Sequence, residues 1–465
     1  MTTGRVAQAS LDVTLSALRA QFGGRLAEGV GVRGQHGNTL SEVPNQPPDA
    51  VVFPKTTDEV ATIVGLCATN RVPVIAFGVG TSFEGHVNAP YGGISIDTSL
   101  MKHVIAVNRD DLDCRVEAGV TREELNQHLR DSGLFFPIDP GANATLGGMA
   151  ATRASGTNAV RYGTMKDAVL SVTAVLADGR IVITGGRARK SSAGYDLTRL
   201  MVGSEGTLGI ITEIGLRLWG VPEEISASVC GFADIRSVCD AVIMTIQSGI
   251  PVARIEFLDE VQARACNVYS KLDLPETPLL FLEFHGSPAS VVEQSERFAE
   301  ISAEFGGKTI ASATRPEERS RLWKARHDAY WAARGLRPDA KGISTDVCVP
   351  ISRLADCIGE TKADGVASGL LAPIIGHVGD GNFHVMPLID FNDAGEVAAG
   401  AAFVDRLVRR AIGFGGTCTG EHGVGQSNMK YLGVEFNAAT LGMMATIKRA
   451  LDPDNIMNPG KIVAP

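Results

Sequence analysis

Residues 73–85, PVIAFGVGTSFEG, carry an apolar segment directly into a glycine-rich loop. The β-branched stretch from Val72 to Phe77 predicts a strand, and the loop from Gly78 to Ser82 offers bare backbone N–H groups and small hydroxyls. The third glycine, Gly85, comes too late for the GxGxxG fingerprint, and residues 88–93 stand where a helix should begin. The sequence therefore disfavours a nicotinamide site of the Rossmann type.

Three more loops share this composition, at residues 141–148, 154–158 and 203–210. Glycine is also abundant in the whole chain: 53 of 465 residues, or about 11%, are glycine, against about 7% in an average protein. Four such loops together could line a long groove in which backbone N–H groups hold the phosphates of a pyrophosphate-bearing cofactor. The alternative is that each loop is a sharp turn in a β-rich domain.

Composition and charge limit the classes of protein to which the chain can belong. Its 465 residues predict two or three domains, and its 44% hydrophobic and 20% charged residues are typical of a globular fold. The net charge of −9 argues against nucleic-acid binding. The eight cysteines form no CxxC pair, which favours reduced thiols, and no apolar run approaches the ~18 residues of a membrane span. We therefore expect a cytoplasmic location, with attachment to a membrane surface, or a mitochondrial location in a eukaryote, as alternatives.

The pattern of predicted elements changes near residue 222. Before it, short strands alternate with helices, among them Thr57–Asn70 with Thr57 as N-cap and a helix that Thr121 begins with a capping-box pattern. After it, charged helical segments alternate with strands such as Leu279–Phe284. We therefore predict an α+β fold in three parts: residues 1–222 with a core from about 46 to 222, a second α+β domain at 223–415, and a C-terminal segment at 416–465.

The strongest local signal for a site is residues 374–385, IIGHVGDGNFHV. Asp-Gly at 380–381, between two apolar runs, predicts a two-residue hairpin turn, which would place His377 directly opposite His384. Directly opposed residues share one face of a sheet, with Cβ atoms about 5 Å apart. The two imidazoles could therefore bind one ion.

Glu421 offers a third ligand to such an ion. It lies in the glycine-bracketed segment TGEHG, residues 419–423, and three of the nine histidines of the chain fall in these two short segments. Two histidines and a carboxylate suit zinc, manganese or iron(II) and leave positions open for a substrate. The alternative is a pair of hydrogen-bonded sheet histidines with no metal between them.

Five segments of the chain resemble those of one protein family: PVIAFGVGTSFEG at 73–85, DPGANATLGGMAA at 139–151, ASG at 154–156, GSEGTLGII at 203–211 and NPGK at 458–461. They are similar to the FAD-binding segments of the vanillyl-alcohol-oxidase/PCMH flavoproteins, and especially to the branch of FAD-linked D-2-hydroxyacid dehydrogenases. The resemblance runs from Pro48 to Lys461. It implies a PCMH-type FAD-binding domain of two α/β subdomains, completed by the C-terminal segment, and a substrate-capping α+β domain between them.

The resemblance also implies roles for individual residues. His377, His384 and Glu421 match ligands of a divalent metal, zinc or manganese, and His422 matches the catalytic histidine. Arg326 and Lys341 match cations that bind the substrate carboxylate. The residues that match FAD contacts all lie in the segments quoted above: Gly78, Gly80, Thr81, Ser82, Pro140, Gly141, Thr145, Gly147, Gly148, Ala154, Ser155, Gly156, Glu205, Gly209, Ile211 and Asn458.

The activity that the resemblance implies is oxidation of a D-2-hydroxy acid, above all D-lactate, to the 2-keto acid (pyruvate). His422 would take the hydroxyl proton and flavin N5 the hydride. An apolar Met386, where relatives acting on dicarboxylates carry a polar residue, favours a short substrate. A glycolate oxidase flavin subunit, a D-2-hydroxyglutarate dehydrogenase and a non-catalytic FAD-binding subunit of a larger complex are the alternatives. Because the chain lacks the cysteine spacings of haem and iron–sulfur sites, we expect an external electron acceptor: a cytochrome, a quinone or a carrier protein.

Overall fold

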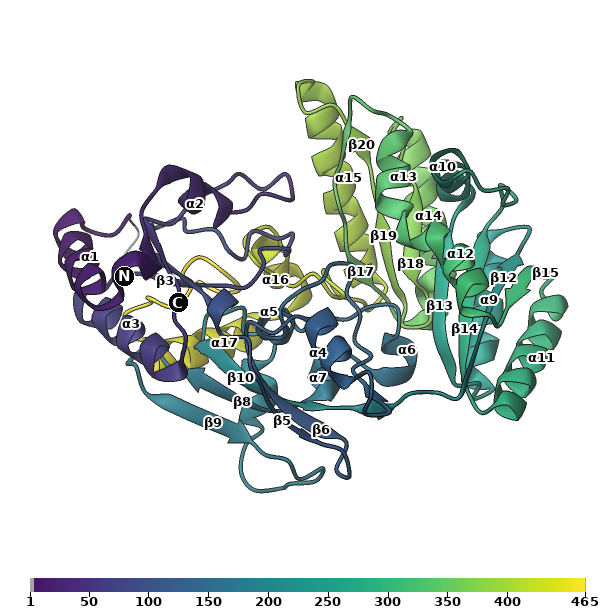
Figure 1. Ribbon diagram of the computed structural model, residues 1–465. Coiled ribbons are helices and arrows are strands. Elements are labelled where there is room, and N and C mark those ends of the chain that lie inside the picture. Colours follow the sequence, from purple (N-terminus) through teal and green to yellow (C-terminus); the bar gives the residue numbers. More distant parts are fainter. Residues whose placement is uncertain (1–3, 465) are drawn as a thin grey trace. The chain divides into compact units, whose positions relative to one another are not determined.

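The computed structural model describes residues 4–464, which form two compact units (Figure 1). The first unit contains the residues up to 155, residues 163–221 and those from 421 onward. The second contains residues 156–162 and 222–420. Both units mix helices and strands, so the predicted α+β class is confirmed.

The described part of the first unit holds three sheets, of which the smallest pairs β7 with β11. A four-stranded sheet has the order β1-β2-β4-β3, in which β2, β4 and β3 are parallel and β1 is antiparallel to β2. A five-stranded antiparallel sheet has the order β5-β6-β10-β8-β9. The strands of this unit are β1 (Leu26–Ala27), β2 (Ala50–Val52), β3 (Val74–Phe77), β4 (Ile94–Asp97), β5 (Val104–Asn108), β6 (Asp113–Glu117), β7 (Leu134–Phe135), β8 (Val169–Val175), β9 (Ile181–Gly185), β10 (Ile210–Arg217) and β11 (Trp219–Gly220).

Of the two helix starts predicted in the first unit, one is confirmed and one is corrected. The capping box of α4 is present, since Thr121 and Glu124 each accept the backbone N–H of the other. The prediction of Thr57 as N-cap is wrong: Thr56 is extended and its hydroxyl accepts the N–H of Glu59, whereas Thr57 already has helical geometry. The helices are α1 (Gln8–Phe22), α2 (Val30–Gln35), α3 (Thr57–Asn70), α4 (Arg122–Leu129), α5 (Leu146–Thr152), α7 (Met165–Ala168), α8 (Leu197–Met201), α16 (Met429–Glu435) and α17 (Ala438–Leu451).

The second unit is built on a seven-stranded antiparallel sheet with the order β15-β12-β14-β13-β18-β19-β17. A two-stranded sheet pairs β16 with β20. The strands are β12 (Glu224–Gly231), β13 (Val252–Leu258), β14 (Leu279–Gly286), β15 (Lys308–Ala313), β16 (Lys341–Gly342), β17 (Val347–Cys348), β18 (Ile374–His377), β19 (Asn382–Val385) and β20 (Leu388–Ile389). The helices are α6 (Ala159–Tyr162), α9 (Ile235–Gln247), α10 (Glu260–Ser270), α11 (Pro288–Glu304), α12 (Pro316–His327), α13 (Ala329–Gly335), α14 (Leu354–Ala367) and α15 (Ala394–Gly413).

One face of the seven-stranded sheet changes from apolar to polar along its strands. Leu258 and Phe281 pack on this face in one core cluster with Ala325 of α12 and with residues of α10 and α13. Alternate residues of a strand share a face, so Glu256 and Arg254 lie on the same face as Leu258. The apolar end anchors the helices, and the polar end is where the candidate site is found.

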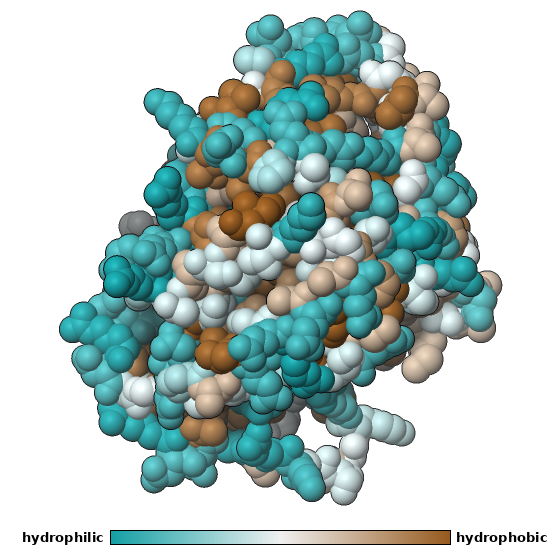
Figure 2. Space-filling model, turned by 90° about the vertical axis from the view of Figure 1, so that its right-hand side faces the viewer, coloured by the Kyte–Doolittle hydropathy of each residue, from teal (hydrophilic) through white to brown (hydrophobic). Residues whose placement is uncertain are grey.

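The surface of the second unit mixes polar and apolar residues. Figure 2 shows apolar residues gathered in the upper part of that view, interspersed with hydrophilic ones. Of the helices in residues 4–464, none has both the length and the hydrophobicity needed to cross a membrane.

Candidate active site and metal centre

The hairpin of β18 and β19 holds both predicted histidine ligands, but not in the predicted register. His384 lies opposite Ile375, and His377 lies opposite Asn382. The predicted two-residue turn is wrong, because the strands are joined by the four residues 378–381, in which the Gly381 N–H donates to the Val378 carbonyl at 3.3 Å. Four-residue loops built around such a turn are a common hairpin connection, and local sequence alone does not choose between the two lengths.

The two imidazoles still share one face of the sheet. The predicted and observed partners of His377 differ by two residues, and a shift of two keeps every side chain on its face, whereas a shift of one would reverse it. The rings of His377 and His384 are therefore diagonal neighbours, with centroids 5.4 Å apart and planes at 86°. The hairpin meets the geometric requirement for a shared ion.

Each histidine has its Nδ1 atom engaged by a neighbour in the second unit. His377 Nδ1 lies 2.7 Å from Glu256 Oε1, and His384 Nδ1 lies 2.9 Å from the carbonyl of Thr345. An acceptor at Nδ1 fixes the tautomer with its proton there, so that the Nε2 lone pair is presented to an ion.

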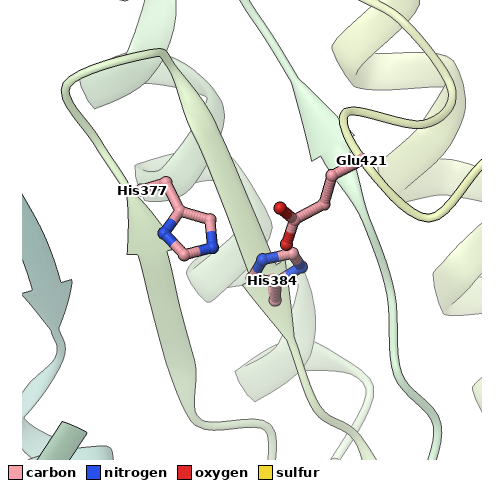
Figure 3. A group of neighbouring side chains, drawn as sticks. All are labelled: His377, His384 and Glu421. Atoms are coloured by element: carbon pink, nitrogen blue, oxygen red, sulfur yellow. The ribbon is translucent and has the colours of Figure 1, made fainter. Parts of the chain in front are cut away.

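Glu421 lies beside the two histidines, and the residues directly before it are held by contacts in the second unit. Thr419 donates its hydroxyl to Asp346, and Gly420 lies so close to Asn382 that a Cβ there would overlap the amide of that side chain. One ligand atom each of His377, His384 and Glu421 lies within 4.8 Å of the others (Figure 3). The donor set of two imidazoles and a carboxylate fits the predicted zinc or manganese, and metal binding itself stays a prediction.

The two cations predicted for the substrate carboxylate have different surroundings. Arg326 of α12 is largely buried, and its Nε donates to Glu256 Oε2 at 2.7 Å. Lys341 of β16 is exposed, with Nζ 6.0 Å from the centroid of the Phe391 ring. The structure thus joins Arg326 to His377 through one shared carboxylate and gives Lys341 a surface contact.

Sequence reasoning missed Glu256, although a signal was present. It is the one acid in the strand VARIEFL and is only 1% exposed. Burial by itself would raise the pKa of Glu256, but the electrostatic interactions and hydrogen bonds with His377 and Arg326 lower it below its ordinary value. A carboxylate in an otherwise apolar buried strand indicates a charged partner on another element.

His422, the predicted catalytic base, lies in a loop of the first unit that neighbouring acids hold. Its ring is 5.0 Å from that of Phe83, and its Nδ1 lies 3.4 Å from Glu84 Oε1. The loop after it is fixed by Glu205, whose carboxylate accepts the N–H groups of Val424 at 2.7 Å and Gly425 at 2.8 Å. The contacts of the Glu205 side chain therefore include this loop, and its role toward FAD stays a prediction.

The first two glycine-rich loops meet in the first unit. A Cβ at Gly78 would overlap the hydroxyl of Thr145, which caps α5 through the N–H of Gly148. Within residues 4–464, none of the backbone N–H groups from Gly78 to Ser82 donates a hydrogen bond to another protein group. This run of unused donors, turned at Gly80 with φ +69°, is a cradle that fits the phosphates of FAD.

The other predicted FAD contacts lie around the same loops. The side-chain amide of Asn458 donates to the carbonyls of Glu205 and His86 at 2.6 and 3.1 Å, which ties the C-terminal segment to the loop at residues 203–210. Gly147 donates its N–H to the Ala118 carbonyl, and Ala154 donates to that of Met149. Four of the predicted residues lie in the loops: Thr81, Ser82, Pro140 and Gly141. Two more, Gly209 and Ile211, lie at the start of β10. Ser155 is the last residue of the first stretch of the first unit, and Gly156 is the first residue of the second unit.

Family models match most of the chain. Residues 48–185 match the model of an FAD binding domain, and residues 221–462 match the model of the C-terminal domain of FAD linked oxidases. The chain belongs to the FAD-linked oxidase family. It is therefore an FAD-dependent oxidoreductase, as the glycine-rich segments predict.

Two relatives and one solved structure show how far the likeness extends. A probable mitochondrial D-lactate dehydrogenase of Danio rerio is 50% identical, over 98% of this chain and 92% of its own. A mitochondrial D-lactate dehydrogenase (cytochrome) of Arabidopsis thaliana is 47% identical, over 90% of this chain and 74% of its own. The structure of p-cresol methylhydroxylase with substrate bound has a TM-score of 0.78 at 17% identity and covers 98% of both chains, which confirms the predicted PCMH-type fold.

Proposed function

We propose that this chain is an FAD- and divalent-metal-dependent dehydrogenase that oxidises a D-2-hydroxy acid, D-lactate above all, to the 2-keto acid. The observation that carries the proposal is the convergence of His377, His384 and Glu421 in a chain of the FAD-linked oxidase family. The names of the two relatives, both D-lactate dehydrogenases, support the choice of substrate.

Oxidation of a 2-hydroxy acid removes the hydroxyl proton and a hydride from the same carbon. Bound FAD supplies the hydride acceptor, and a divalent ion supplies a Lewis acid for the hydroxyl group. His422 takes the hydroxyl proton, and its contacts with Phe83 and Glu84 hold the ring in one orientation.

Arg326 binds the substrate carboxylate in this proposal. Because its Nε is held by Glu256, the two terminal nitrogens are the ones that a carboxylate would contact, in the paired geometry that guanidinium groups favour. Lys341, exposed on β16, is the second cation proposed for this role. Orientation by these groups would set the reacting carbon against the hydride acceptor.

The proposed electron acceptor is an external cytochrome. The name of the Arabidopsis relative includes a cytochrome, and both relatives are named as mitochondrial. We propose a mitochondrial location if the source is a eukaryote.

Anaerobic stopped-flow mixing tests the proposal. The FAD-loaded protein is mixed with D-lactate, L-lactate, glycolate and D-2-hydroxyglutarate in separate runs, and bleaching of the flavin absorbance is followed. We expect D-lactate to give the fastest bleaching. Faster bleaching by glycolate or D-2-hydroxyglutarate would assign the protein to those substrates, and no bleaching by any of the four would favour a non-catalytic subunit.

The variant His422→Ala tests the proton acceptor in the same experiment. It should retain FAD but reduce it roughly 10²–10⁴-fold more slowly, the usual contribution of a general base. Reduction at the wild-type rate would remove His422 from the mechanism.

A further inference from the structure

Glu256 connects two groups that the proposed function uses for different purposes. Its Oε1 accepts from Nδ1 of His377, and its Oε2 accepts from Nε of Arg326, both at 2.7 Å. The three residues come from β18, β13 and α12, and all belong to the second unit. One carboxylate thus contacts a proposed metal ligand with one oxygen and the proposed substrate cation with the other.

Glu256 lies in the core, so burial of its carboxylate costs free energy unless both partners are present. Its neighbours in β13, Ile255 and Phe257, are at most 1% exposed, and Glu256 itself is 1% exposed. A buried carboxylate is tolerated where its oxygens are paired with charged or hydrogen-bonding groups. The packing of the strand does not require an acid at this position. The presence of Glu256 is therefore explained by its contacts with His377 and Arg326.

We propose that Glu256 is a positioning residue that holds both the metal ligand His377 and the substrate-binding Arg326 in their working orientations. The inference rests on the proposed function. Hydrogen bonding at Nδ1 directs the Nε2 lone pair of His377 toward the ion, the arrangement that raises metal affinity at histidine ligands. Engagement of Nε turns the terminal nitrogens of Arg326 outward for a carboxylate.

The neighbouring strand provides a matched control. Glu283 of β14 is 5% exposed, its Oε1 lies 2.7 Å from His285 Nε2, and its Oε2 lies 3.7 Å from Arg254 Nη1. It therefore has the same kinds of partner as Glu256, an imidazole and a guanidinium, on the same sheet. His285 is outside the proposed metal ligands, so loss of the Glu283 carboxylate should affect packing without affecting the ion.

The test compares Glu256→Gln with Glu283→Gln in the FAD-loaded, metal-depleted protein. Mn²⁺ is titrated in, and free Mn²⁺ is measured by electron paramagnetic resonance. We expect Glu256→Gln to weaken Mn²⁺ binding 10–100-fold, the usual effect of removing the partner of a ligating histidine, and Glu283→Gln to change it less than about threefold. Equal Mn²⁺ affinity in wild type and Glu256→Gln, or an equal loss in both variants, would overturn the proposal.

A second measurement tests the other half of the inference. The KM for D-lactate should rise tenfold or more in Glu256→Gln, beyond any change in kcat, and stay near wild type in Glu283→Gln. If Glu256→Gln does not fold, Glu256→Asp, which keeps the charge but cannot reach both partners, should give the same two losses; wild-type values there would overturn the proposal. The Mn²⁺ titration needs no turnover, so it tests the role of Glu256 even if the substrate assignment is incorrect. Failure of the wild type to bind Mn²⁺ would overturn both the metal site and this role of Glu256.

Discussion

The carboxylate of Glu205 accepts the backbone N–H of Val424 at 2.7 Å, although 219 positions of sequence separate the two residues. Its other oxygen accepts the N–H of Gly425 at 2.8 Å, and His86 Nε2 lies 3.4 Å from the carboxylate. Burial alone would raise the pKa of Glu205, but His86 and the two N–H donors lower it below its ordinary value. An ionised acid thus holds the loop that begins directly after His422.

Glu205→Ala should free this loop. Hydrogen bonds from a backbone N–H to a charged acceptor contribute about 1.5–3 kcal/mol each, so their loss should raise the exchange rates of the Val424 and Gly425 amides by roughly tenfold or more. Hydrogen–deuterium exchange with mass spectrometry of the peptide that covers residues 421–427 measures this. Glu213→Ala, which removes an acid from β10 of the same unit, is the control and should leave the peptide unchanged; equal exchange in wild type and Glu205→Ala would show that the contact does not hold the loop.

Gly420→Ala should weaken the metal site without removing any ligand. A Cβ at this position would overlap the side-chain amide of Asn382 and lie 3.1 Å from Asp346 Oδ1. Asn382 donates to Asp346 at 2.7 Å and cannot move freely, so the chain should shift at Gly420 and carry Glu421 with it. We expect Mn²⁺ affinity to fall at least tenfold in equilibrium dialysis.

Gly413→Ala is the matched control for this substitution. A Cβ there would have no atom within 4 Å, and Gly413 ends helix α15 ahead of the same segment. Its Mn²⁺ affinity should equal that of the wild type. If Gly420→Ala also bound Mn²⁺ with the affinity of the wild type, the idea that close packing at Gly420 positions Glu421 would be contradicted.

Lys461 should make stability depend on pH in the alkaline range. Burial lowers the pKa of this lysine from 10.5 to about 7 in the folded protein, while Nζ donates to the carbonyl of Asn88 at 2.8 Å. Between these two pKa values the unfolded chain binds a proton that the folded protein lacks, so stability should rise with pH across this window, by up to about 1.4 kcal/mol per pH unit. Below pH 7 both states are protonated and this contribution to the slope disappears.

Urea unfolding of Lys461→Met from pH 6 to pH 10 tests this dependence. The variant should lose the rise in unfolding free energy that the wild type shows above about pH 7. Lys430→Met removes an exposed lysine and should keep the wild-type slope. An identical slope in wild type and Lys461→Met would mean that this lysine keeps its proton in the folded state.

The sequence could predict the parts of this protein that depend on neighbours along the chain. The capping box at Thr121 and Glu124 and the strand that leads into the first glycine-rich loop, observed as Val74–Phe77, follow from local residue preferences and are confirmed. The shared face of His377 and His384 also follows from the sequence, because the two-residue period of a strand survives an even error in register. The length of the hairpin loop does not, since Asp-Gly is compatible with a turn of either length.

Only the tertiary structure decides which distant residues meet. Glu256 is separated from Arg326 by 70 positions and from His377 by 121, and Glu205 from Val424 by 219. Periodicity along one segment sets which face a side chain occupies, but the order of strands β14-β13-β18 sets the neighbour on that face. The sequence by itself therefore determined the residue types of the site and the faces they occupy. Strand order, which depends on burying whole elements against each other, decided that Glu256 of the buried strand β13 contacts both His377 and Arg326.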